Sequence, residues 1–199
     1  MMNNTLVDVP KLKFSEPRHN LPGRKGIATA EDRFTIAFAR AYFEQAPSIH
    51  HKAKRTQLAL AREIPINGYG ITDLLAVAWQ EVPGEVFPNS EAFAEVVQPT
   101  VRAFEMKLDN WRKAIAQASR YKNFAHQAIA VVPKSIGPMA TEYIETFRRI
   151  RVGLWLFDSG SGVIQPIYTP RPATPRSSRY RIESIHKAAQ VAKSSLPIA

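Results

Sequence analysis

The spacing of apolar residues predicts a helix that begins near Thr29. Thr29 can cap the first turn, which carries Glu31 and Asp32, and Pro47 is expected to end the helix. Apolar side chains recur on one helical face, at Phe34, Ala37, Phe38, Ala41 and Tyr42. The residues before this helix, 1–27, are polar, basic and rich in turn formers, which indicates an irregular N-terminal arm.

Beyond this helix the pattern becomes typical of strands. The segments that predict strands are, in order, Glu63–Ile66, Ile71–Trp79 and Thr100–Lys107. The first two join across the glycine-rich turn Asn67–Gly70, as in a β-hairpin. The second is nearly all apolar after Asp73, which favours a strand covered on both faces. The segment Glu81–Pro99, with a short acidic helix around Ser90–Val97, is expected to interrupt the sheet.

The second half of the chain alternates helices with strands. The predicted elements are a helix from about Asn110 to Phe124 capped by Asp109, a strand His126–Val132, a helix Gly137–Arg149, and a hairpin of Val152–Phe157 and Val163–Tyr168. After Thr169 the sequence is rich in proline and arginine, with a short amphipathic helix over Ile182–Lys193. This order predicts an α/β domain over residues 28–168, a single mixed β-sheet flanked by helices, and a C-terminal extension, 169–199.

Composition narrows the class of protein. The 199 residues carry a formal net charge of +10, which suits a polyanionic partner, nucleic acid first and an anionic membrane surface second. The chain has no cysteine, which excludes disulfide scaffolds, thiolate zinc sites and cysteine nucleophiles. No run reaches the ~18 apolar residues that span a bilayer, and the N-terminus lacks an apolar signal core, so we expect a cytoplasmic protein.

Three residues of the predicted strands indicate metal chemistry. Asp73 opens an apolar strand, where a lone carboxylate is costly unless it is paired or liganded. Glu105 and Lys107 lie two positions apart on the third strand, so their side chains point to the same face. If the two strands are neighbours, the carboxylates can supply oxygen ligands to Mg²⁺. The lysine can then orient a water that attacks a phosphate, or help to deprotonate it.

The helix after the third strand can bring further polar groups to this site. Gln117 and Tyr121 are four residues apart and share one helical face, with Lys113 one turn earlier and Arg120 adjacent to Tyr121. The opposite face is apolar and should pack on the sheet. Such a helix can carry an amide, a hydroxyl and a guanidinium to the rim of the carboxylate site.

Two segments, GITDLLAV and FEMKLDNWRKAIAQASRYKNFAHQAIAVVP, resemble the PD-(D/E)xK nuclease superfamily. Asp73 matches the aspartate of the first motif, although Thr72 precedes it where the motif has proline. The (D/E)xK and QxxxY elements match at Glu105, Lys107, Gln117 and Tyr121. The resemblance implies a restriction-endonuclease-like core over residues 28–168, with Mg²⁺ or Mn²⁺ as the cofactor. A glutamate of the first helix often completes the metal site in this family, and Glu44 and Glu31 are the two candidates.

Each of these residues also has a plainer interpretation. Asp73 could be a turn or capping residue, and Glu105 with Lys107 could form a solvated ion pair on an edge strand. The adjacent histidines of the basic connector His50–Arg55 diverge on a regular element, so they favour a linker over a metal site. No phosphate-binding loop, nucleophile elbow or zinc-protease motif is present.

The sequence therefore predicts a Mg²⁺-dependent, or Mn²⁺-dependent, deoxyribonuclease. Its expected catalytic residues are Asp73, Glu105, Lys107, Gln117 and Tyr121, and its expected metal ligands are Asp73, Glu105 and Glu44 or Glu31. The residues expected to contact nucleic acid are Lys113, Arg120, Arg148 and Arg149. The expected partner is double- or single-stranded DNA, without a membrane, and the chain is compatible with a homodimer. The alternative is a catalytically inactive module with the nuclease fold, which binds nucleic acid or has a regulatory role. A protein-interaction domain without a nucleic-acid partner is the third interpretation.

Overall fold

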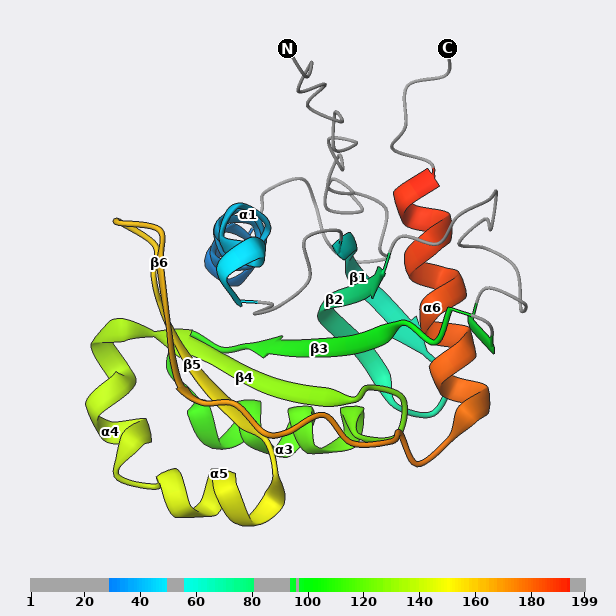
Figure 1. Cartoon of the computed structure of the whole chain (residues 1–199). Helices are drawn as coiled ribbons and strands as arrows, with labels where there is room; N and C mark the ends of the chain where they lie inside the picture. Colours follow the sequence, from blue (N-terminus) through cyan, green and yellow to red (C-terminus); the bar gives the residue numbers. More distant parts are fainter. Residues whose placement is uncertain (1–28, 50–55, 81–93, 96, 194–199) are drawn as a thin grey trace, which may run out of the picture.

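The computed structural model describes residues 29–49, 56–80, 94–95 and 97–193 (Figure 1). The predicted N-terminal arm, the connector His50–Arg55 and most of Glu81–Pro99 lie outside the described residues. Within the described residues, no helix is both long enough and apolar enough to cross a membrane.

A single six-stranded mixed sheet forms the centre of the molecule, and its strands are ordered as they occur in the chain. The strands are β1 Thr56–Ile66, β2 Gly70–Gln80, β3 Thr100–Met106, β4 Gln127–Pro133, β5 Gly153–Asp158 and β6 Val163–Tyr168. β4 runs parallel to both β3 and β5, and the other neighbouring pairs are antiparallel. The predicted α/β class with one mixed sheet is confirmed.

Helices cover both faces of this sheet (Figure 1). They are α1 Ala30–Ile49, α3 Trp111–Tyr121, α4 Gly137–Thr141, α5 Ile144–Ile150 and α6 Ser178–Lys193, with a 3₁₀ turn at Lys134–Ile136. Strand alternation divides the core between the faces, as β3 shows. Phe104 and Met106 pack with α1, whereas Val101 and Ala103 pack with the residues of α3, α5 and α6.

The first hairpin is longer than predicted. β1 begins at Thr56, seven residues before the expected Glu63, because its first half pairs with the second half of β2. This half contains alanines, which have little strand preference of their own, so the local pattern understated it. The helix α1 also continues to Ile49, past the expected end at Pro47. A proline so near a helix end removes only one of the last backbone hydrogen bonds.

Three further boundaries differ from the prediction. Asn110, rather than Asp109, caps α3, and its side chain accepts a hydrogen bond from the Lys113 backbone N–H at 2.9 Å. The helix expected over Gly137–Arg149 is divided into α4 and α5, which bury Ala140 and Phe147 in the same cluster. The C-terminal helix begins at Ser178, four residues before the expected start.

Candidate active site

The pairing of β2 with β3 places the predicted acidic residues on neighbouring positions. Leu74 lies opposite Phe104, so Asp73 and Glu105 fall on the next step of the same ladder. Both alternate with residues of the α1 side of the core, so both side chains belong to the α3 side of the sheet. The side chains of Asp73 and Glu105 therefore come close to each other only because two strands distant in the sequence pair.

The ammonium of Lys107 is the point on which three carboxylates converge. Its Nζ lies 2.6 Å from Glu31 Oε1, 3.0 Å from Glu105 Oε1 and 3.9 Å from Asp73 Oδ2. Lys107 directly follows β3, and the three acids come from α1, β3 and β2. The predicted Asp73–Glu105–Lys107 set is therefore brought together by the fold.

Burial falls steadily from one side of this cluster to the other. The side chain of Glu105 is 1% exposed and that of Lys107 13%, whereas Asp73 is 27% exposed and Glu31 41%. The cluster thus has a dry interior at Glu105 and a face open to solvent at Asp73 and Glu31. Asp73 and Glu31 are therefore the acids of the cluster that solvent reaches most easily.

Tyr121 holds the buried end of the cluster. Its hydroxyl donates a hydrogen bond to Glu105 Oε2 and lies 3.1 Å from the carbonyl oxygen of Ile71. Tyr121 is the last residue of α3, which packs against β3 and β4. Burial, followed by the charge of Glu105, raises the pKa of Tyr121, so its hydroxyl stays a neutral donor at physiological pH.

Asp73 is fixed by the backbone of the neighbouring strand. Its Oδ2 accepts a hydrogen bond of 2.8 Å from the Met106 N–H. Burial and the nearby charge of Glu105 raise the pKa of Asp73 to about 7, against the lowering effects of this hydrogen bond and of Lys107. The raised pKa is what two carboxylates produce when they share a poorly hydrated space.

Lys107 is maintained as a cation. Burial alone would lower its pKa, but the hydrogen bond to Glu31 and the charges of Asp73 and Glu105 raise the pKa above its usual range. A protonated lysine donates hydrogen bonds and offers positive charge. A lysine that stays protonated can donate hydrogen bonds but cannot take a proton from a water.

The structure distinguishes between the two glutamates of the first helix that were candidates for the metal site. Glu31 lies in the first turn of α1 and contacts Lys107. Glu44 is exposed and lies thirteen residues further along the helix, which is about 20 Å at the helical rise per residue. Glu31 therefore belongs to the cluster, and Glu44 does not.

The other predicted residues lie outside this cluster of contacts. Gln117 is on α3 one turn before Tyr121, and its Oε1 is buried without a hydrogen-bond partner. Lys113, Arg120 and Arg149 are exposed. Arg148 is also exposed and pairs with Glu145 at 2.5 Å on α5. The four basic residues contribute positive charge to the surface, and no contact of theirs or of Gln117 with the acidic cluster is recorded among the described residues.

Sequence reasoning missed Arg62, a buried arginine of β1 near the cluster. The residue is 4% exposed, and it lies opposite Leu74, the neighbour of Asp73. The next residue, Glu63, has a left-handed backbone with φ 52° and lies between the pairs Arg62–Leu74 and Ile64–Thr72. The available signal was the charged pair Arg62 and Glu63 among the otherwise uncharged positions 58–66. It was lost because the strand was expected to start at Glu63, after Arg62.

The donor set suits a hard divalent cation. Asp73 and Glu105 offer carboxylate oxygens, and Glu105 Oε1 is buried with an ion-pair contact to Lys107 but no hydrogen bond. Among the described residues, no three histidine, cysteine or acidic side chains are arranged to enclose a metal by themselves. A Mg²⁺ ion at this site would therefore take one or two protein carboxylates and complete its shell with water and substrate oxygens.

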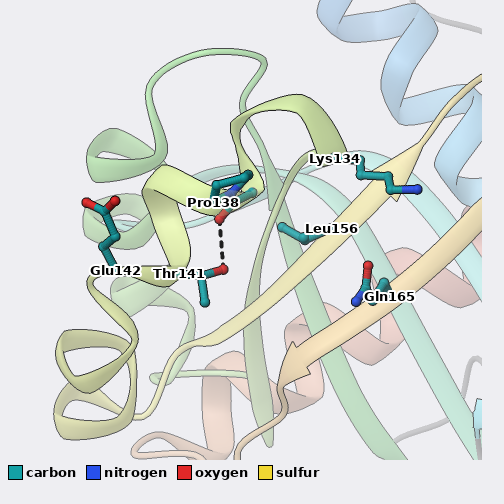
Figure 2. A pocket seen from close by; sticks show the side chains of 7 residues that line it. Lys134, Pro138, Thr141, Glu142, Leu156 and Gln165 are labelled. Carbon is teal, nitrogen blue, oxygen red and sulfur yellow. Dashed lines mark hydrogen bonds between the residues drawn. The ribbon is translucent and has the colours of Figure 1, made fainter.

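A separate pocket lies elsewhere on the same sheet. It has a volume of about 530 Å³ and lies where the segment after β4 meets β5 and β6. Figure 2 shows its lining, which consists of Lys134, Gly137, Pro138, Thr141, Glu142, Leu156 and Gln165. It includes none of the predicted site residues, and the chemistry of the acidic cluster does not extend into it.

Comparison of the chain with protein-family models and with curated proteins finds no match.

Proposed function

We propose that the protein is a metal-dependent nuclease that hydrolyses phosphodiester bonds in DNA. The observation that carries the proposal is the convergence of Glu31, Asp73 and Glu105 on the ammonium of Lys107. A half-open cluster of carboxylates beside one partly buried cation suits metal-assisted phosphodiester hydrolysis. The resemblance to the PD-(D/E)xK superfamily and a restriction-endonuclease-like core are consistent with this arrangement.

In this proposal the residues divide the work between binding and orientation. Asp73 and Glu105 hold Mg²⁺ or Mn²⁺ through carboxylate oxygens. The bound cation would polarise a phosphoryl oxygen and lower the pKa of a water. Lys107 donates hydrogen bonds to the attacking water or to a phosphate oxygen, and its charge offsets the negative charge that develops there. Glu31 and Tyr121 hold Lys107 and Glu105 in position.

The surface charge favours a nucleic-acid substrate. The chain has a formal net charge of +10, although its candidate active site is rich in acids. Exposed basic side chains on α3 and α5, including Lys113, Arg120 and Arg149, can contact phosphates and raise the local concentration of a polyanion. The acids of the site then recruit the cation rather than the DNA.

The test compares Asp73→Ala with Glu44→Ala. Wild-type protein should cut plasmid or single-stranded DNA with Mg²⁺ or Mn²⁺, and Asp73→Ala should slow cutting at least about a hundredfold because a metal ligand is lost. Glu44→Ala also removes one carboxylate, but outside the cluster, and should cut at the wild-type rate. Circular dichroism checks that both variants are folded.

The remaining outcomes separate the alternatives. Salt-sensitive DNA binding by the wild-type protein, with no cutting by any divalent cation, would favour the inactive nuclease-fold module. Absence of salt-sensitive DNA binding would instead favour a protein-interaction domain. Equal cutting by wild type and Asp73→Ala would remove the proposed mechanism.

A further inference from the structure

Arg62 is a buried cation that the proposed mechanism does not use. It lies on β1, opposite Leu74 on β2, and is 4% exposed. Asp32 in the first turn of α1, Glu63 beside it and Asp73 across the sheet all act on it electrostatically. Because its partner Leu74 packs with α1, Arg62 lies on the α1 face of the sheet, whereas Asp73 and Glu105 lie on the α3 face. Its link to the candidate active site is through Asp32, the neighbour of Glu31, and through the charge of Asp73.

Its guanidinium is not satisfied by the described part of the chain. Nε and Nη1 are buried and have no hydrogen-bond partner, and none of the described carboxylates forms an ion pair with Arg62. A buried guanidinium without partners is costly, because its charge and its N–H groups have lost water and gained nothing in return. Burial accordingly lowers the pKa of Arg62, against the opposing effects of Glu63, Asp32 and Asp73.

Arg102 shows how the same fold satisfies a buried arginine. It is 8% exposed, yet its Nε donates to Gln127 Oε1 and its Nη1 donates to Tyr42, both at 2.8 Å. Its guanidinium also lies 5.4 Å from the centre of the Trp155 ring. Nε and Nη1 of Arg62, in contrast, have no such partner among the described residues.

We propose that Arg62 is a second anion-binding point of this site, and that its guanidinium hydrogen-bonds a phosphate oxygen of the bound nucleic-acid backbone. The planar fork of arginine matches two phosphate oxygens, and a phosphodiester would supply the anion that none of the described residues provides. This inference rests on the proposed function, since it takes nucleic acid as the ligand.

The proposal makes two predictions of opposite sign for Arg62→Met. Removing an unsatisfied buried charge should leave the melting temperature of the free protein unchanged or raise it by roughly 2 °C or more. The same substitution should weaken binding of a fluorescent DNA oligonucleotide about tenfold, because a charge-assisted hydrogen bond to phosphate is lost. Binding is measured in EDTA, so that no cutting occurs.

Arg102→Met is the matched control, because it removes a buried arginine that has its partners. It should lower the melting temperature by several degrees. A fall of that size in Arg62→Met would overturn the proposal whatever happens to binding, since it would show that the chain itself satisfies Arg62. Unchanged DNA affinity in Arg62→Met would overturn it as well.

Failure of this inference is distinguishable from failure of the proposed function. The proposed function fails if the wild-type protein does not cut DNA, or if Asp73→Ala cuts as fast as wild type. The role of Arg62 is judged by metal-free affinity and by stability, neither of which depends on turnover. Arg62→Lys, which keeps the charge without the planar fork, should bind with an affinity between those of wild type and Arg62→Met.

Discussion

At the scale of single residues, the candidate site depends on one amine. The ammonium of Lys107 has three N–H donors, and three carboxylates from separate elements lie around it. Without this cation, Asp73 and Glu105 would repel each other in a poorly hydrated space, as the raised pKa of Asp73 already indicates. Lys107 therefore organises the acids structurally as well as serving the proposed chemistry.

His126 gives a residue-scale prediction about stability and pH. Its Nδ1 accepts a hydrogen bond of 3.0 Å from the Val101 N–H, and burial followed by the charge of Arg181 lowers its pKa to about 4. Between pH 7 and pH 4 the unfolded chain takes up a proton at His126, whereas the folded protein does not. The contribution of His126 is therefore fully present near pH 7 and is lost as the pH falls, by roughly 2 kcal/mol after solvent screening.

Urea unfolding of wild type and His126→Gln at pH 7 and at pH 4.5 checks this prediction. Glutamine can accept the same hydrogen bond from Val101 but does not titrate, so the variant should lose less stability on acidification. Asp73, whose raised pKa acts in the opposite direction, is present in both proteins and cancels in the difference. Identical pH dependence in the two proteins would contradict the assignment.

At the scale of elements, the sequence predicted the bounds of a strand or helix best where the residues that mark those bounds lie within the element or in its turn. β3 and the β5–β6 hairpin lie within one residue of expectation, because apolar alternation and a glycine-rich turn mark them. The first seven residues of β1 were not predicted as strand, because they form a strand only by pairing with β2. The break between α4 and α5 falls at Glu142 and Tyr143, where the sequence has neither glycine nor proline to signal it.

The C-terminal helix gives an element-scale prediction. α6 lies against β1 and β2, and it buries Ile185 and Ala188 in the same cluster as α3 and the sheet. Ile185→Ala should therefore lower the free energy of unfolding by about 2–5 kcal/mol through the lost burial and the cavity left behind. Denaturant unfolding measures the change.

Ser178→Ala is the control on the same helix, because Ser178 is exposed at its start. It should change the free energy of unfolding by less than about 0.5 kcal/mol. If Ile185→Ala had an equally small effect, α6 would not contribute to the stability of the sheet.

At the scale of the whole molecule, the site is an acidic cluster in a strongly basic chain. The strand residues of the cluster could be predicted from the sequence, because alternation within β3 places Glu105 and Lys107 on one face. The choice between Glu31 and Glu44 could not, since it depends on which end of α1 lies over the end of β3. Arg62 escaped for a similar reason, because its burial arises from elements distant in the sequence.

The most direct test of the account is the rate at which Lys107→Met cuts DNA in Mg²⁺ or Mn²⁺, relative to wild type. The substitution keeps an unbranched side chain, one heavy atom shorter, and removes its charge and its N–H groups. The account predicts a rate lower by about 10²–10³-fold, with DNA binding retained. Cutting by Lys107→Met at the wild-type rate would contradict the central claim that the acids and this amine form the active site.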